Sequence, residues 1–177
     1  MVNLPEDAVI VGCAGRFSPM KGFDQLPEVL ARLPDNVHVV HAGEGEFEQQ
    51  IKSAIQARPE SSRVHFLGYQ QDMDRFFAGI DLFLLCSRNE GMANVLNEAM
   101  SYGKPVVSTR VPGSEELLGH GKYGILVEVD DVDAMAAGVR ALVDGDRQFD
   151  PMALRQWIDR EFGMHRMVKE TNRLFFE

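Results

Sequence analysis

Short, nearly continuous apolar runs alternate along the chain with longer segments in which apolar positions recur every three or four residues. Runs such as residues 9–11 and 82–85 are typical of strands that are buried on both faces of a sheet. Alternation of such strands with amphipathic helices indicates β-α-β units and a parallel sheet. The six predicted strands span residues 8–14, 36–42, 63–67, 81–86, 105–108 and 124–127.

The segments between these strands predict helices. The clearest is the last, where apolar positions between Val132 and Val143 form one stripe that would pack on the sheet. Pro27 inside the first predicted helix and Gly138 inside the last argue against regular continuity at those points. The five predicted helices span residues 22–33, 46–58, 72–78, 94–102 and 131–143.

The segment after Asp150 has no strand pattern and carries Arg, Met and aromatic residues at helical spacing. It predicts two terminal helices within residues 151–177, a C-terminal helical tail. Trp157 and Phe162 contribute bulky apolar surface, so we expect the tail to pack on the sheet or on another domain.

Length and charge narrow the picture further. The 177 residues, of which 45% are hydrophobic and 25% charged, predict one α/β domain over residues 1–177, a Rossmann-like three-layer sandwich with a six-stranded parallel sheet. With 18 Lys and Arg against 27 Asp and Glu, the net charge of −9 argues against a nucleic-acid partner. Because the chain has neither a run of about 18 apolar residues nor the pattern of a secretion signal, we expect a soluble, cytoplasmic protein.

Cysteine and histidine spacing offers no metal or catalytic-base pattern. Cys13 and Cys86 belong to no CxxC pair, which argues against a disulfide framework or a zinc site and predicts free, buried thiols. No metal and no cofactor are expected. The histidines are scattered without a pairing that indicates a base: His38, His41, His65, His120 and His165.

Two loops at the carboxyl ends of predicted strands are unusual, and ligands of open parallel sheets collect at such ends. The first loop, residues 12–22, combines glycines with Arg16 and Lys21, two cations that could reach one diphosphate from different sides. Its glycine spacing matches neither a dinucleotide fingerprint nor a Walker A loop. From spacing alone, a glycine turn with two solvated cations is an equal alternative.

The second loop, residues 87–93, leads into the helix predicted from Asn94, whose free N–H groups would point to the same side as the first loop. Glu90 precedes this helix and Glu98 lies on it. A diphosphate would repel these carboxylates unless cations offset them, so they fit best as partners of hydroxyl groups. Hydroxyl-rich groups on both sides of a diphosphate describe a nucleotide sugar. The alternative is a solvated Glu98 and a surface turn at Glu90.

The segment Gly15-Arg16 followed by Lys21-Gly22, together with Glu90-x7-Glu98 and the later Gly103-Lys104-Pro105, resembles a known family. It is similar to the C-terminal, donor-binding domain of the retaining family four glycosyltransferases, also called group 1, which have the GT-B fold. The match covers residues 8–145, with both motifs in the expected order.

The resemblance implies metal-independent transfer of a hexosyl group from a nucleoside diphosphate sugar, of UDP or GDP type, to an acceptor in bacterial polysaccharide or glycolipid synthesis. Glu90, Arg16 and Lys21 would be catalytic: the two cations would hold the diphosphate and Glu90 would position the donor sugar. Glu98 would bind the ribose hydroxyls. The remaining nucleotide-sugar contacts would come from Gly15, Gly68, Tyr69, Gly91, Met92, Ala93 and Asn94.

Family members are about twice this length, so the resemblance implies that an N-terminal acceptor domain is absent here and that this chain alone is inactive. A peripheral membrane association of the full-length enzyme stays open. The chain departs from the family pattern at Cys86, Ala93 and Pro112, which leaves its charged groups intact. Two other functions remain: half of a nucleotide-sugar epimerase of GT-B fold, and a non-catalytic Rossmann-like interaction domain.

Overall fold

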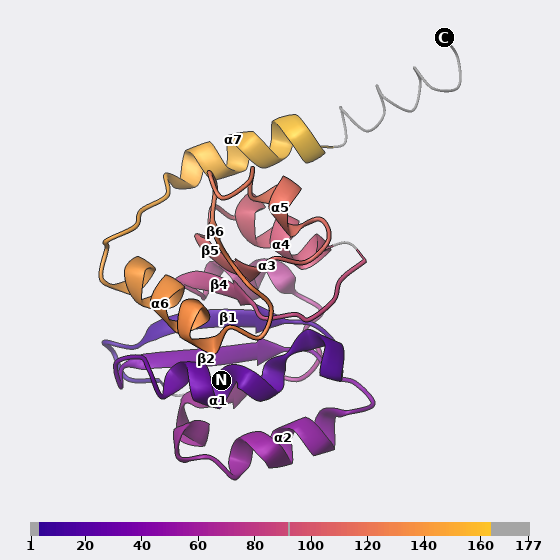
Figure 1. Cartoon of the computed structure of the whole chain (residues 1–177), viewed down its shortest axis with the longest axis vertical. Helices are drawn as coiled ribbons and strands as arrows, with labels where there is room; N and C mark the ends of the chain where they lie inside the picture. The colour runs from indigo at the N-terminus through magenta and orange to yellow at the C-terminus, as the bar shows by residue number, and fades with distance from the viewer. Residues whose placement is uncertain (1–3, 92, 164–177) are drawn as a thin grey trace.

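A computed structural model describes residues 4–91 and 93–163, which form a six-stranded, entirely parallel sheet (Figure 1). The strand order is β3-β2-β1-β4-β5-β6, so the sheet grows in one direction from β1 to β3 and in the other from β4 to β6. The predicted Rossmann-like fold and its six strands are confirmed. The strands are β1 (Val9–Ala14), β2 (Val37–Ala42), β3 (Val64–Phe66), β4 (Leu82–Leu85), β5 (Val106–Thr109) and β6 (Ile125–Val127).

Helices cover both faces of this sheet and make the predicted three layers (Figure 1). One core packs α1, α2 and α6 on one face, and the other packs α3, α4, α5 and α7 on the opposite face. Along β4 the side chains alternate between the two cores, with Leu82 and Leu84 in the first and Phe83 and Leu85 in the second. The helices are α1 (Leu26–Leu30), α2 (Glu48–Gln56), α3 (Met73–Ala78), α4 (Asn94–Ser101), α5 (Ser114–Leu117), α6 (Val132–Val143) and α7 (Pro151–Phe162).

The first predicted helix, residues 22–33, is wrong in its extent. The structure has a 3-10 turn at Phe23–Gln25 followed by the short helix α1, in which Pro27 occupies the first turn. Proline is tolerated there because the first N–H groups of a helix have no intrahelical partner. By contrast, α6 is continuous through Gly138, which brings the helix close to the sheet: a Cβ at this position would lie 3.1 Å from a methyl carbon of Val107.

The start of the C-terminal tail packs on the domain itself. Helix α7 contacts α4, and the indole of Trp157 donates a hydrogen bond to the carbonyl of Leu117 (2.8 Å) while it stacks on Tyr123. The predicted second terminal helix lies outside the described residues.

Two expectations about cysteine and histidine are settled by packing. Cys13 and Cys86 are free and buried, as predicted, although a hydrogen bond from one to the other and burial raise the pKa of the Cys13 thiol. The histidines are not all scattered: His38 Nδ1 lies 3.0 Å from His65 Nε2 on the neighbouring strand. Pairing of β2 with β3 creates this contact. It could not be predicted from the sequence, because 26 residues separate the two histidines.

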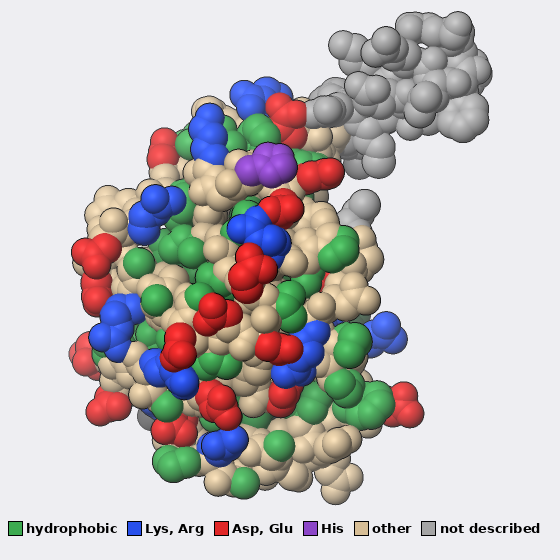
Figure 2. All heavy atoms as spheres, in the orientation of Figure 1, with side chains coloured by type: hydrophobic (Ala, Val, Ile, Leu, Met, Phe, Trp, Pro, Cys, Tyr) green, Lys and Arg blue, Asp and Glu red, His purple; other side chains and the backbone are tan. Residues whose placement is uncertain are grey.

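On the face drawn in Figure 2, basic side chains are interspersed with acidic ones over the globular body. Within the described part of the chain, no helix is long and apolar enough to cross a lipid bilayer.

Candidate functional site

A cleft of about 810 Å³ opens at the carboxyl ends of β1, β2 and β4. Strands β1 and β4 are the neighbours at which the strand order reverses, and the loops that leave them run to opposite sides of the sheet. This reversal leaves a crevice between the two loops, the place where open parallel sheets bind ligands. The cleft is lined by both loops, by the loop after β2, by the loop after β3 and by the start of α4.

The loop after β1 is held in shape by close backbone packing. Ser18 caps a 3-10 turn at Pro19–Lys21, and its hydroxyl accepts a hydrogen bond from the N–H of Met20. Gly22 ends this turn with a φ of +69°, and a Cβ there would lie 2.0 Å from the carbonyl oxygen of Cys86. Only glycine fits this position, so the turn lies directly against the loop after β4.

Lys21 and Glu90 form an ion pair inside the cleft. The Lys21 ammonium donates to both carboxylate oxygens of Glu90, at 2.7 and 2.8 Å. The hydroxyl of Ser87 donates to one of the same oxygens at 2.6 Å, and the Glu90 side chain is only 8% exposed. Lys21 and Ser87 therefore fix the Glu90 carboxylate in one orientation, which argues against a solvated surface turn at Glu90.

Arg16, unlike Lys21, is not engaged in an ion pair among the described residues. It lines the cleft and is exposed, and among the described residues its guanidinium has no side-chain hydrogen bond or ion pair. An unpaired guanidinium keeps its five donors for a ligand and can hold a phosphate through two parallel hydrogen bonds.

The start of α4 faces the same cleft. Ala93 is the N-cap residue and makes no side-chain capping bond, so the first N–H groups of the helix have no side-chain partner among the described residues. Ala93, Asn94 and Val95 line the cleft at this point. Free N–H groups and the positive end of the helix dipole favour an anion here.

Glu98 lies one turn further along α4 and also lines the cleft. Glu98 is exposed, but neighbouring protein atoms partly desolvate its carboxyl and raise its pKa, and no ion pair offsets this among the described residues. A carboxylate in this setting gains from hydrogen-bond donors such as sugar hydroxyls.

The far end of the cleft is formed by the loops after β2 and β3. The carboxylate of Glu44 accepts a hydrogen bond from the N–H of Tyr69 at 3.2 Å, which joins the two loops. Tyr69 is 71% exposed at the cleft, where its ring offers a flat apolar surface to a ligand. A Cβ on Gly43 would lie 2.1 Å from the carbonyl oxygen of Gly15, so this glycine allows the first loop to approach.

His41 lies behind the cleft, fully buried on β2 between the rings of Phe17 and Phe23, each 4.3 Å away between ring centres. Burial lowers the pKa of His41 to about 4, so the ring is neutral near pH 7. The pair of His38 and His65 does not line the cleft.

Most of the residues that the sequence singled out come together in this cleft. Gly68 and Gly91 do not line the cleft, although their sequence neighbours Tyr69 and Glu90 do. Met92 lies outside the described residues. Those that line it are Gly15, Arg16, Lys21, Tyr69, Glu90, Ala93, Asn94 and Glu98.

Sequence reasoning missed Glu44 and Ser87. The segment Gly43-Glu44-Gly45 lacks the third glycine of a dinucleotide fingerprint and so gives no recognisable signal, yet its glutamate joins two loops of the cleft. Ser87 is a small polar residue three positions before Glu90, a spacing that carries no signal until the turn between them is known.

Comparison with known proteins places the chain in a family. Residues 2–157 match the family described as glycosyl transferases group 1. The chain is 35% identical over 142 residues to the lipopolysaccharide core biosynthesis glycosyltransferase LpsE of Rhizobium meliloti (strain 1021), covering 80% of this chain and 42% of that protein. It is 29% identical over 143 residues to LpsD of the same organism, covering 81% and 41%. The chain thus spans less than half the length of these relatives.

Solved structures give the same result. HepE of Anabaena in complex with UDP is 27% identical and superposes with a TM-score of 0.84 over 96% of this chain and 50% of its own. The lipopolysaccharide outer core galactosyltransferase WaaB, 22% identical, shares the fold with a TM-score of 0.84 over 97% of this chain and 51% of its own. Sequence and fold agree, and the chain belongs to the group 1 glycosyltransferases.

Proposed function

We propose that this chain is the donor-binding domain of a retaining, metal-independent glycosyltransferase, which binds a nucleoside diphosphate sugar in the cleft described above. The observation that carries the proposal is the convergence of Arg16, Lys21 and the uncapped start of α4 on one cleft. The chain's similarity to HepE, whose structure contains UDP, supports a nucleotide ligand.

The diphosphate would lie between the first loop and α4. Arg16 would donate hydrogen bonds to it, and the N–H groups of Ala93 and Asn94 would add the partial positive charge of the helix end. Lys21 would be shared between Glu90 and the phosphates, so that its ammonium offsets the negative charge that develops on the leaving diphosphate. Cationic side chains thereby supply the charge stabilisation that a divalent ion supplies in other transferases.

The two carboxylates would address hydroxyl groups. Glu98 would accept hydrogen bonds from the ribose, which fits its place in the cleft lining and its lack of a described ion partner. Glu90, held by Lys21 and Ser87, would be oriented toward the donor sugar. The base would lie toward Gly68 and Tyr69.

The acceptor would be bound by a second domain, as a transfer reaction needs both substrates oriented and water excluded. This chain alone would then bind donor without transferring its sugar. The similarity to lipopolysaccharide glycosyltransferases favours an acceptor of bacterial cell-surface glycolipid or polysaccharide synthesis in the cytoplasm.

Isothermal titration calorimetry of the chain with UDP, GDP and ADP tests the proposal. At least one of these nucleotides should bind, and Arg16→Ala should weaken that binding by about 1.5–3 kcal/mol, the value of a charge-assisted hydrogen bond. Arg58→Ala removes an exposed arginine that pairs with Glu28 outside the cleft and serves as the matched control. Absence of binding to all three nucleotides would favour the non-catalytic interaction domain instead.

A further inference from the structure

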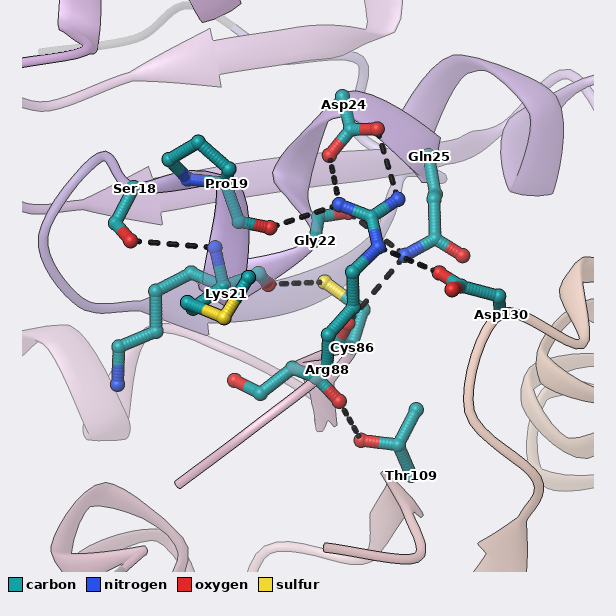
Figure 3. A network of polar contacts seen from close by, with 12 residues as sticks. Ser18, Pro19, Lys21, Gly22, Asp24, Gln25, Cys86, Arg88, Thr109 and Asp130 are labelled. Carbon is teal, nitrogen blue, oxygen red and sulfur yellow. Dashed lines mark hydrogen bonds and ion pairs between the residues drawn. The ribbon is translucent and has the colours of Figure 1, made fainter. Parts of the chain in front are cut away.

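Arg88 lies behind the cleft and holds three loops together (Figure 3). Its guanidinium makes two parallel hydrogen bonds to Asp24, at 2.8 and 2.9 Å, and donates to the carbonyl of Pro19 at 2.8 Å. Its Nε donates to Asp130 at 2.7 Å, on the loop between β6 and α6. Arg88 itself belongs to the loop after β4, so its contacts reach the loops after β1 and β6.

Hydrogen bonds to backbone carbonyls also join the loop after β4 to its neighbours. The N–H of Arg88 donates to the carbonyl of Met20 at 2.7 Å, and the thiol of Cys86 donates to the carbonyl of Lys21 at 3.3 Å. The hydroxyl of Thr109, at the end of β5, donates to the carbonyl of Ser87 at 2.6 Å and so fixes the loop after β4 to the neighbouring strand. The turn that carries Lys21 therefore rests on the loop that carries Glu90.

This cluster differs from an ordinary surface ion pair. The Arg88 side chain is 26% exposed, and the planar guanidinium matches the two oxygens of Asp24 in a way that a lysine ammonium could not. Asp130 has a φ of +61°, a left-handed conformation that is uncommon outside glycine, and its carboxylate is one of the two that Arg88 binds.

We propose that Arg88 is a positioning residue for diphosphate recognition: it fixes the turn at Pro19–Lys21 against the loop after β4, so that the Lys21 ammonium stays in the cleft beside Glu90. The inference rests on the proposed function of the cleft. Arg88 acts through Lys21, because it is not among the described residues that line the cleft. Figure 3 shows the Lys21 side chain pointing away from the Arg88 guanidinium.

The consequence of losing Arg88 follows from what would remain. The turn keeps its internal bonds, from the N–H of Met20 to the Ser18 hydroxyl and from the N–H of Lys21 to the Ser18 carbonyl. It also keeps the bonds that the backbone N–H at position 88 and the Cys86 thiol donate to the carbonyls of Met20 and Lys21. What it loses is the side-chain contact of Pro19 and Asp24 with the loop after β4. The intact turn would then be held less firmly, and binding of the ligand group that Lys21 contacts would weaken while binding of the rest of the nucleotide would not.

The test is calorimetric titration of the 177-residue chain with UDP and with UMP, which lacks the second phosphate. Arg88→Ala should weaken UDP binding about tenfold and change UMP binding less than twofold. Arg110→Ala is the matched control, because Arg110 also pairs with two carboxylates, Glu115 and Glu128, away from the cleft, and it should leave both affinities unchanged. Equal losses of UDP and UMP in Arg88→Ala, or no loss of either, would overturn the inference.

Two further variants keep the result interpretable. Asp24→Asn removes the charged partner of Arg88 on the loop after β1 without removing Arg88, and it should also weaken UDP binding selectively if Arg88→Ala does not fold. The double variant Arg88→Ala with Lys21→Ala should bind UDP no more weakly than Lys21→Ala alone, since both changes act on one contact. Full UDP binding by Lys21→Ala would refute the proposed diphosphate site itself. A loss in Lys21→Ala without one in Arg88→Ala would refute only the role of Arg88.

Discussion

The pairing of Lys21 with Glu90 gives an unusual prediction: Glu90→Gln should bind UDP more tightly than the unaltered chain. A diphosphate and the Glu90 carboxylate compete for one ammonium. Glutamine keeps the size of the side chain and an oxygen for the Ser87 hydroxyl, but it removes the negative charge. The competition should therefore weaken without loss of the loop geometry.

The magnitude follows from the contacts. Lys21 donates to the two Glu90 oxygens at 2.7 and 2.8 Å, and the Glu90 side chain is 8% exposed, so water screens the pair only in part. Two unit charges about 4 Å apart interact by about 4 kcal/mol at an effective dielectric constant of about 20, before desolvation is subtracted. A net value of about 1.5 kcal/mol remains reasonable for a charge-assisted hydrogen bond and corresponds to roughly tenfold in affinity.

Calorimetric titration with UDP at fixed ionic strength measures this gain. Glu48→Gln is the matched control, because Glu48 accepts from Lys52 at 2.6 Å in an ion pair that does not line the cleft, and it should leave the UDP affinity unchanged. If Glu90→Gln bound UDP as weakly as the unaltered chain, or more weakly, the competition between the carboxylate and the diphosphate would be disproved.

Three other predictions concern ribose recognition, loop geometry and pH. Glu98→Ala should weaken UDP binding by about 1.5 kcal/mol and leave binding of inorganic pyrophosphate unchanged, since pyrophosphate has no ribose; equal losses would refute the assignment. Gly22→Ala should lower the free energy of unfolding by about 2–4 kcal/mol in urea, because φ is +69° and the new Cβ would meet a carbonyl oxygen at 2.0 Å. Gly91→Ala, where no described atom lies within 4 Å of the new Cβ, should change it by less than about 0.5 kcal/mol, and similar values for both variants would contradict this. His41 takes up a proton near pH 6.5 when unfolded but near 4 when folded, so stability present above pH 6.5 should fall by up to about 3 kcal/mol toward pH 4; His41→Leu should lose this component, and an unchanged pH dependence would disprove it.

The strands were predictable because each is short and mostly apolar, the pattern that burial on both faces of a parallel sheet favours. The first helix was not, since the pattern of residues 22–33 does not reveal that Gly22 ends one turn in a left-handed conformation and that α1 begins only at Leu26. The four-residue helix α5 likewise has no periodicity long enough to detect.

The candidate site was likewise predictable only in part. Arg16, Lys21 and Glu98 could be assigned to one cleft because parallel topology brings the carboxyl ends of β1 and β4 to one edge. The contact between Lys21 and Glu90 could not be predicted, since it depends on side-chain geometry across 68 intervening residues. The contacts of Arg88 could not be predicted for the same reason, because its partners come from two other loops, those after β1 and β6.

The most direct test of the account is mapping of the UDP site by amide chemical shifts in NMR spectra of the chain. We expect saturating UDP to move the amide signals of Gly15, Arg16, Ala93 and Asn94 most strongly, with smaller shifts at Tyr69. Largest shifts outside the cleft, around Arg110 and Gly121, with unchanged signals in the cleft, would contradict it.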